Sequence, residues 1–77
     1  SIELGNGDYT IRELAGNQFT VTIKYHSKNQ TDLDNFLKDI IKNFKNEDYI
    51  LRFNNSSEFY NDNLQMHQIT ILYRGLV

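Results

Sequence analysis

One stretch of this 77-residue chain has the periodicity of an amphipathic helix. Its apolar side chains follow the i, i+3, i+4 spacing that gathers them in a single stripe, and they are Leu33, Phe36, Leu37, Ile40, Ile41 and Phe44. Thr31 and Asp34 have the spacing of a capping box, with an acid shorter than the usual glutamate. Lys42 and Lys45 favour the negative end of the helix dipole. The sequence therefore predicts a helix that begins at Thr31 and buries one face.

The segments on both sides of this helix have the alternating pattern of strands. The expected strands are residues 9–14, 19–26, 48–54 and 65–74. Ala15-Gly16-Asn17 supplies a turn between the first two. Residues 1–7 are expected to be a lead-in, and residues 54–63 a polar loop. The order ββαββ predicts an α+β fold, in which one helix packs on one face of a four-stranded, mostly antiparallel sheet.

Length and composition exclude several classes of protein. The chain is long enough for one small domain, residues 1–77. It has no cysteine for a disulfide or a thiolate zinc site, which suits a reducing cytoplasm. No apolar run approaches the roughly 20 residues of a membrane helix. Because the chain begins with Ser1 and its only methionine is Met66, we expect a processed chain or a domain excised from a longer one.

The overall charge excludes a bulk electrostatic attraction to nucleic acid, because ten acids stand against eight lysines and arginines. The charges are nevertheless expected to separate between surfaces. If the apolar series of each strand faces the helix, the opposite face carries Thr10, Arg12, Thr20, Thr22, Lys24, His26, Arg52, Gln68, Thr70 and Arg74. We expect neither a carboxylate nor an aromatic side chain on this face. It is either an ordinary solvated face or a binding site for a polyanion or an acidic protein, with Arg12, Lys24, Arg52 and Arg74 as its cations.

Two aromatic residues, Phe59 and Tyr60, lie in the predicted polar loop. They either fold back onto the core or stay exposed as anchors for a protein partner. The only histidines, His26 and His67, have no cysteine or triad order beside them, so we expect polar strand residues.

An acidic motif, Asp32-Leu33-Asp34-Asn35, opens the predicted helix and is followed by Lys38. Another acid precedes the last strand, in Asn61-Asp62. This arrangement resembles the RusA-type Holliday-junction resolvases. The resemblance implies that Asp32, Asp34 and Asp62 bind magnesium and that Lys38 assists phosphodiester hydrolysis. Carboxylate oxygens are suitable ligands for magnesium in such chemistry. Stabilisation of the helix start explains Asp32 and Asp34 without a metal, so both interpretations stay open.

In its ββαββ order, the whole chain resembles the folded part of small phage anti-CRISPR proteins. The similar segments are Asp8-Tyr9-Thr10-Ile11-Arg12, Val21-Thr22-Ile23-Lys24, Asp39-Ile40-Ile41-Lys42, Tyr49 to Phe53 and Tyr73-Arg74-Gly75-Leu76. In these segments the chain resembles the folded part of an inhibitor of type II CRISPR effector nucleases. The resemblance implies a non-enzymatic protein that binds the effector nuclease or its guide complex.

We therefore expect a non-enzymatic binding protein of phage or mobile-element origin, without a cofactor. The alternatives are a nucleic-acid-binding module that uses the basic sheet face, and a magnesium-dependent junction nuclease. Either edge of the sheet could also support dimerisation by strand pairing, and the sequence selects neither.

Overall fold

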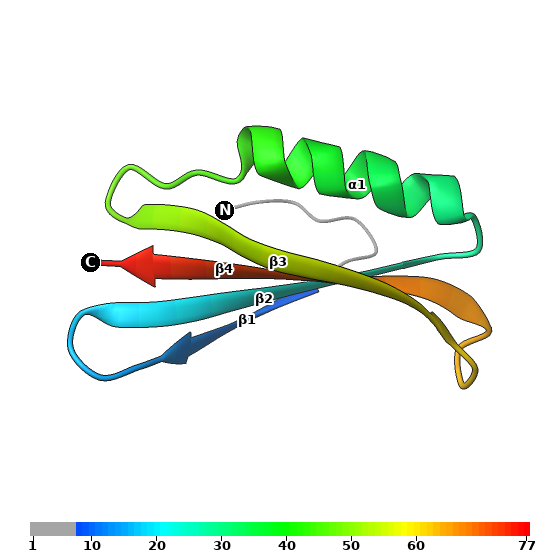
Figure 1. The fold of residues 1–77 in the computed structure, drawn as a ribbon, viewed down its shortest axis with the longest axis horizontal. Helices are drawn as coiled ribbons and strands as arrows, with labels where there is room; N and C mark the ends of the chain where they lie inside the picture. Colours follow the sequence, from blue (N-terminus) through cyan, green and yellow to red (C-terminus); the bar gives the residue numbers. More distant parts are fainter. Residues whose placement is uncertain (1–7) are drawn as a thin grey trace.

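The computed structural model describes residues 8–77 and confirms the α+β class and the ββαββ order. The expected lead-in, residues 1–7, lies outside the described residues. The elements are β1 (Asp8–Glu13), β2 (Gln18–Ser27), α1 (Gln30–Asn43), β3 (Ile50–Asn61) and β4 (Met66–Leu76) (Figure 1). α1 is the one helix in this part of the chain, and it is too short and too polar to cross a membrane.

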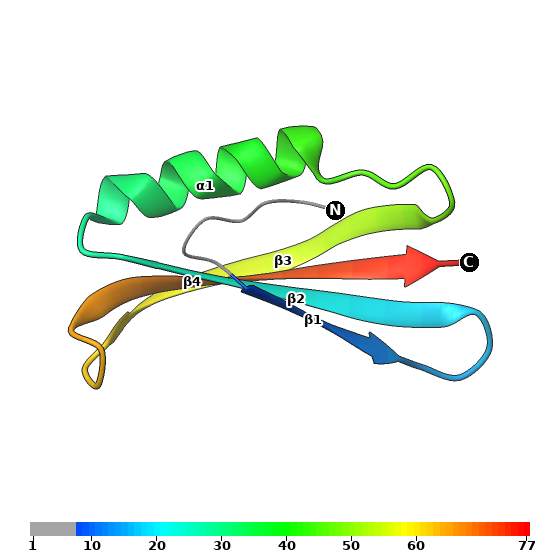
Figure 2. The same ribbon diagram turned by 180° about the vertical axis from the view of Figure 1, so that it is seen from behind.

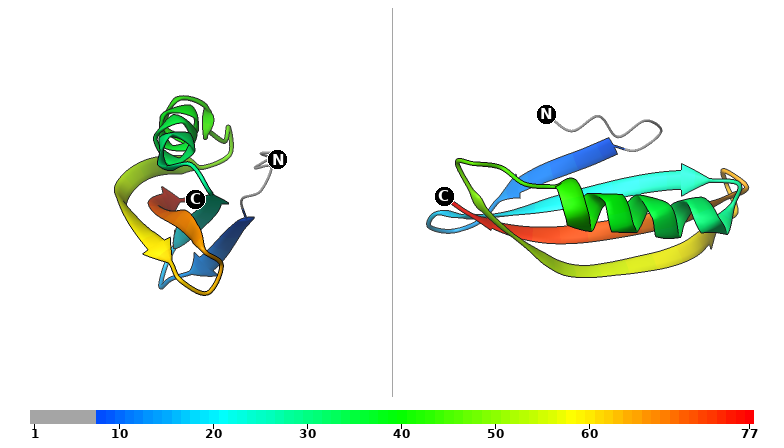
Figure 3. Two further views of the ribbon diagram at one scale, coloured as in Figure 1. Left: turned by 90° about the vertical axis from the view of Figure 1, so that its right-hand side faces the viewer. Right: turned by 90° about the horizontal axis from the view of Figure 1, so that it is seen from above.

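The four strands form one antiparallel sheet in the order β1-β2-β4-β3. α1 lies along one side of this sheet and packs on its two central strands, β2 and β4 (Figures 1 and 2). The view from above in Figure 3 shows β1 and β3 as the two edges, on either side of the helix. An antiparallel sheet of this kind can bury one face and leave the other to solvent.

The core lies between α1 and the central strands. Its buried side chains come from alternate positions of β2 and β4 and from one stripe of the helix, and they are Phe19, Val21, Ile23, Leu33, Ile40, Ile69, Ile71 and Tyr73. Phe36, Leu37 and Phe44 pack at its border. Ile41 does not join them, because it lies at the outer edge of the stripe and is 50% exposed.

The turns between paired strands use the residues that their backbones require. Gly16 has a φ of 74°, which confirms the predicted turn between β1 and β2. Between β3 and β4, the side-chain oxygen of Asn61 accepts hydrogen bonds from the amides of Asn63 and Leu64 at 3.0 and 3.1 Å. Gln65 completes this turn with a φ of 54°.

The helix begins differently from the prediction. Its N-cap is Asn29, so Thr31 lies inside the first turn and the predicted capping box is wrong. Asp32 instead accepts a hydrogen bond of 2.6 Å from the hydroxyl of Ser27, at the end of β2. This bond ties the first turn to the preceding strand, and the carboxylate also favours the positive end of the helix dipole.

β3 is longer than predicted, since it continues from Ile50 to Asn61 through most of the expected loop. Its register shifts at a β-bulge, where Phe53 pairs with Tyr73 and Asn55 with Leu72. Asn54 is the extra residue. The alternation of side chains before the bulge therefore does not continue beyond it. Each residue after Asn54 lies on the face opposite to the one that an unbroken alternation would give.

Candidate functional site

Within residues 8–77, the face of the sheet opposite α1 is covered by no other element. We call it the open face. The strand registers and the alternation of side chains place on it Asp8, Thr10, Arg12, Thr20, Thr22, Lys24, His26, Arg52, Asn55, Ser57, Phe59, Gln68, Thr70, Leu72 and Arg74. All ten residues predicted for this face lie on it. Asp8, Asn55, Ser57, Phe59 and Leu72 are additions.

The open face has a strong excess of positive charge. Arg12, Lys24, Arg52 and Arg74 all lie on it, against the single carboxylate of Asp8. The prediction of a face without a carboxylate is therefore wrong. Asp8 pairs directly with Lys24 across β1 and β2, an arrangement in which opposite charges attract. The three arginines lie away from this pair.

Those three arginines form one row across the sheet. Arg12 pairs with Thr20, Thr20 with Arg74, and Arg74 with Arg52, so the row extends from one edge to the other. Arg52 and Arg74 are direct cross-strand neighbours, and like charges in this position repel each other. An anion bound between the two guanidinium groups would remove this repulsion and accept their hydrogen bonds.

A second row borders the arginines at the same end of the sheet. Leu14, Gln18, Leu76 and Ile50 continue the alternation of the open face by one step, and the three apolar members are 37 to 57% exposed. A cleft of about 360 Å³ is lined by residues of both rows, including Arg52 and Arg74. Arginine and apolar side chains are thus adjacent, and arginine is the charged residue that is enriched at protein interfaces.

The other end of the open face holds a polar network around Gln68, which is 6% exposed. The side-chain oxygen of Gln68 lies 2.9 Å from Nε2 of His26 and accepts a hydrogen bond of 3.1 Å from the amide of Asn61. The Gln68 amide donates to the hydroxyl of Thr70 at 3.4 Å. His26 is therefore held by a neutral amide, as expected for a polar strand residue.

Phe59 and Tyr60 are neither in a loop nor folded back into the core. Both belong to β3, and they are 48% and 51% exposed. Phe59 pairs with Gln68 and lies on the open face, so the prediction of a face without aromatic side chains is wrong. Tyr60 lies on the helix side, and the centroids of its ring and of the His67 ring are 5.2 Å apart. The two aromatics therefore cannot anchor one partner on a single flat surface.

The acidic residues of the alternative nuclease interpretation lie in separate surroundings. Asp32 accepts from Ser27, Asp34 approaches Glu58, and Asp62 lies exposed in the turn after β3. Lys38 is exposed on α1. Among residues 8–77, no three histidine, aspartate or glutamate side chains gather to hold a metal ion. The geometry therefore gives no support to a magnesium site of Asp32, Asp34 and Asp62.

Glu58 lies on the helix side of β3, close to the start of α1. Partial desolvation raises the pKa of its carboxyl above the ordinary value of 4.5, and hydrogen bonding to Asp34 and its like charge raise this pKa further. A hydrogen bond from Gln30 and the charge of His67 act in the opposite direction. Folding therefore favours the protonated form of Glu58.

This pKa shift predicts a pH-dependent effect of Glu58→Gln. The stabilisation from proton binding is fully present below pH 4.5 and is lost as the pH rises through the higher pKa of the folded state. Because Glu58 is exposed to solvent, we expect the variant to be more stable than the parent at neutral pH by only a few tenths of a kcal/mol. Urea unfolding across this pH range measures the difference, and Glu47→Gln in the α1–β3 connection is the control for the charge change. A gain that persists below pH 4.5 would contradict the explanation.

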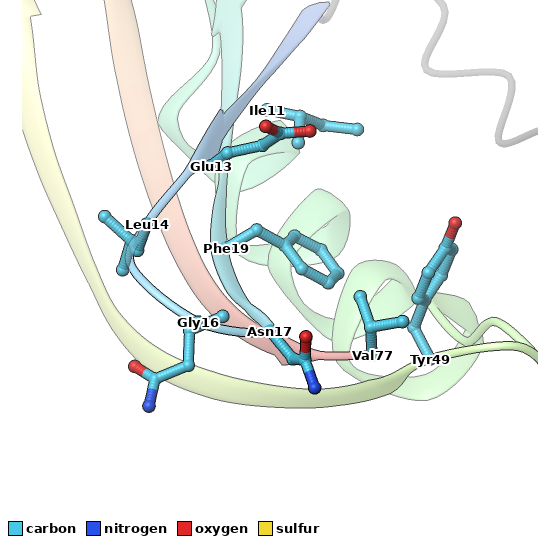
Figure 4. Close-up of a pocket in the computed structure, with 9 residues that line it drawn as sticks. Ile11, Glu13, Leu14, Gly16, Asn17, Phe19, Tyr49 and Val77 are labelled. Atoms are coloured by element: carbon cyan, nitrogen blue, oxygen red, sulfur yellow. The ribbon is translucent and has the colours of Figure 1, made fainter.

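A separate cleft of about 320 Å³ opens on the helix side, near the turn between β1 and β2. Figure 4 shows the ring of Phe19 directed toward Tyr49 and Val77, with Ile11 on the neighbouring strand. The rings of Phe19 and Tyr49 meet edge to face, with centroids 5.3 Å apart. The lining of this cleft is largely apolar. No set of polar side chains from the described part of the chain converges in it, so the cleft does not suggest a catalytic or ligand-binding site.

The arginine row was accessible to sequence reasoning through the two-residue period, whereas Phe59 and Leu72 were missed. Phe59 has the parity of Leu51 and Phe53, which lie on the helix side of β3, and only the bulge at Asn54 brings it to the open face. The open face and its arginine row are the candidate site. Comparison of the chain with protein-family models, curated proteins and solved structures found no match.

Proposed function

We propose that this protein is a non-enzymatic binding protein whose open face engages an anionic partner. The observation that carries the proposal is the direct pairing of Arg52 with Arg74, in a row that also holds Arg12. Two uncompensated cations side by side are costly without a ligand, and guanidinium groups match carboxylate and phosphate oxygens. The adjoining apolar row favours a macromolecular partner over a free ion.

The partner that we propose is a type II CRISPR effector nuclease in its guide complex, in the cytoplasm of the host cell. The resemblance to phage anti-CRISPR proteins motivates this choice. A guide complex also offers phosphate oxygens beside protein surface, and this combination suits a face with arginines next to exposed leucine and isoleucine. A nucleic acid alone is the second candidate, because Phe59 adds one aromatic side chain on which a base could stack.

The combined variant Arg52→Glu and Arg74→Glu tests the open face. The new glutamates keep a like-charged cross-strand pair, so folding stability is expected to change little while attraction for an anion is reversed. Loss of two charge-assisted contacts predicts binding that is weaker by about 100-fold or more. Fluorescence anisotropy with the guide-loaded effector measures it, and the same titration with single-stranded RNA alone separates the two candidate partners.

The matched control is Lys38→Glu with Lys42→Glu. It makes the same change in net charge on α1, on the other side of the molecule. We expect its affinity to stay within about threefold of the parent, because exposed charges beyond about 10 Å are largely screened at physiological salt. Equal losses for both double variants would show a non-specific charge effect, and no loss for the arginine variant would overturn the proposal.

Cleavage of plasmid DNA by a programmed type II effector tests the narrower proposal. We expect dose-dependent protection by the parent protein and none by the Arg52→Glu, Arg74→Glu variant. A parallel reaction contains the protein alone with magnesium and branched DNA. Cutting in that reaction would refute the non-enzymatic proposal and return attention to Asp32, Asp34 and Asp62.

A further inference from the structure

The outer edge of β1 has a defined set of unpaired backbone groups. The amide of Leu14 donates to the carbonyl of Gln18 on β2 at 2.9 Å. Because hydrogen-bonded and non-hydrogen-bonded pairs alternate along an antiparallel ladder, Thr10 and Arg12 also bond toward β2. Tyr9 and Ile11 therefore direct their N–H and C=O groups away from the sheet, at an edge to which no other described strand pairs.

The side chains along this edge are exposed and of two kinds. Tyr9 and Ile11 lie on the helix side, and they are 51% and 56% exposed because α1 packs on β2 and β4 instead. Asp8 and Arg12 lie on the open face, four residues apart and of opposite charge. From Asp8 to Arg12 the strand is thus apolar on one side and carries complementary charges on the other, and Glu13 follows on the helix side.

We infer that β1 pairs with β1 of a second copy, antiparallel and centred on Thr10. This register is one of those that align the free groups of Tyr9 and Ile11, and it places Tyr9 of each copy opposite Ile11 of the other. It also places Asp8 of each copy opposite Arg12 of the other. A two-residue shift in either direction leaves one of these charges opposite Thr10 instead.

The pairing closes on itself, because the two-fold axis passes through the Thr10 pair and repeats every contact. The other edge of the sheet is less suited to pairing. β3 is interrupted by the bulge at Asn54, which breaks the even spacing of its free N–H and C=O groups. In the β1 pair, both open faces lie on the same side of one eight-stranded sheet. The inference does not depend on the proposed function.

Charge reversal tests both the pairing and its register. Sedimentation equilibrium of the parent should show a concentration-dependent dimer. Asp8→Arg alone and Arg12→Asp alone each place like charges opposite one another at two symmetry-related positions, so we expect the dimer to weaken by about tenfold or more. The variant with both substitutions restores opposite charges in the same register, and its dimer should recover.

Recovery of the dimer in the combined variant would show that the single substitutions act through the contact between copies, and not through an effect within one copy. Asp8→Arg also faces Lys24 of its own chain, and the combined variant keeps that repulsion. If dimerisation is still lost when both charges are exchanged, the inferred register is wrong. A parent that stays monomeric up to about 1 mM would overturn the pairing itself.

Amide hydrogen exchange supplies a readout that does not involve side-chain charge. In the dimer, exchange at Tyr9 and Ile11 should slow as the protein concentration rises. Exchange at Thr10 and Arg12 should stay slow throughout, because these amides already bond to β2. Concentration-dependent protection at Ser56 and Glu58, on the β3 edge, would instead assign the dimer to the other side of the sheet and refute the inference.

Discussion

Leu33→Ala is expected to remove about 2–5 kcal/mol from the free energy of unfolding, the usual range for deleting a buried leucine side chain. Leu33 has no exposed surface, and it is one of two helix residues counted among the buried core. Alanine is a good helix former, so the loss reports packing and not helix propensity. In a small domain this is a large part of the total stability. Urea unfolding followed by circular dichroism measures it.

Ile41→Ala is the matched control, since it also shortens an aliphatic side chain of α1. Ile41 belongs to the predicted apolar stripe but is 50% exposed, so we expect a change within about 0.5 kcal/mol. Equal losses at Leu33 and Ile41 would contradict the orientation of the helix on the sheet.

Gly75→Ala is expected to destabilise the protein by about 1–3 kcal/mol, although it adds only one methyl group. Gly75 pairs with Phe19 on the neighbouring strand, and a Cβ at this position would overlap the Phe19 ring. The ring is 9% exposed and also meets Tyr49, so it can move only by giving up core contacts. Thermal unfolding monitored by circular dichroism should show a lower midpoint.

A double-mutant cycle isolates this contact. Phe19→Leu removes the ring, and in that background the added methyl group of Gly75→Ala has room, so the second substitution should cost much less than in the parent. Gly16→Ala is a useful contrast, because no atom lies within 4 Å of a Cβ there and its penalty would come from the positive φ of 74°. Additive losses at Phe19 and Gly75 would show that the overlap is not the cause.

The central part of this fold is predictable because its local signals agree. The two-residue period of β2 assigns Phe19, Val21 and Ile23 to the core, and the helix period does the same for Leu33 and Ile40. Register then places the basic residues of all four strands on the opposite face. For these elements, burial of one apolar series determines which face every other side chain occupies.

Three features could not be predicted, each for a physical reason. The polar run Asn54-Asn55-Ser56-Ser57 has the composition of a turn, and it is a strand because β4 supplies its backbone partners. The hydrophobic pattern does not indicate the bulge at Asn54, so the sequence does not predict which side of the sheet Phe59 occupies. α1 begins after Asn29, and its first turn is tied to β2 by the contact between Ser27 and Asp32, which a capping pattern does not encode.

The separation of charge between the open face and the remainder of the molecule governs how a partner approaches. With a net charge of −2, the protein as a whole repels a distant polyanion. Only within about a Debye length, roughly 8–10 Å, does the field of the arginine row exceed that of the acids behind it. Encounters are then productive in one orientation, with α1 turned away from the partner. Added salt weakens long-range repulsion and short-range attraction together, so the association rate should depend on ionic strength far less than that of a uniformly basic protein.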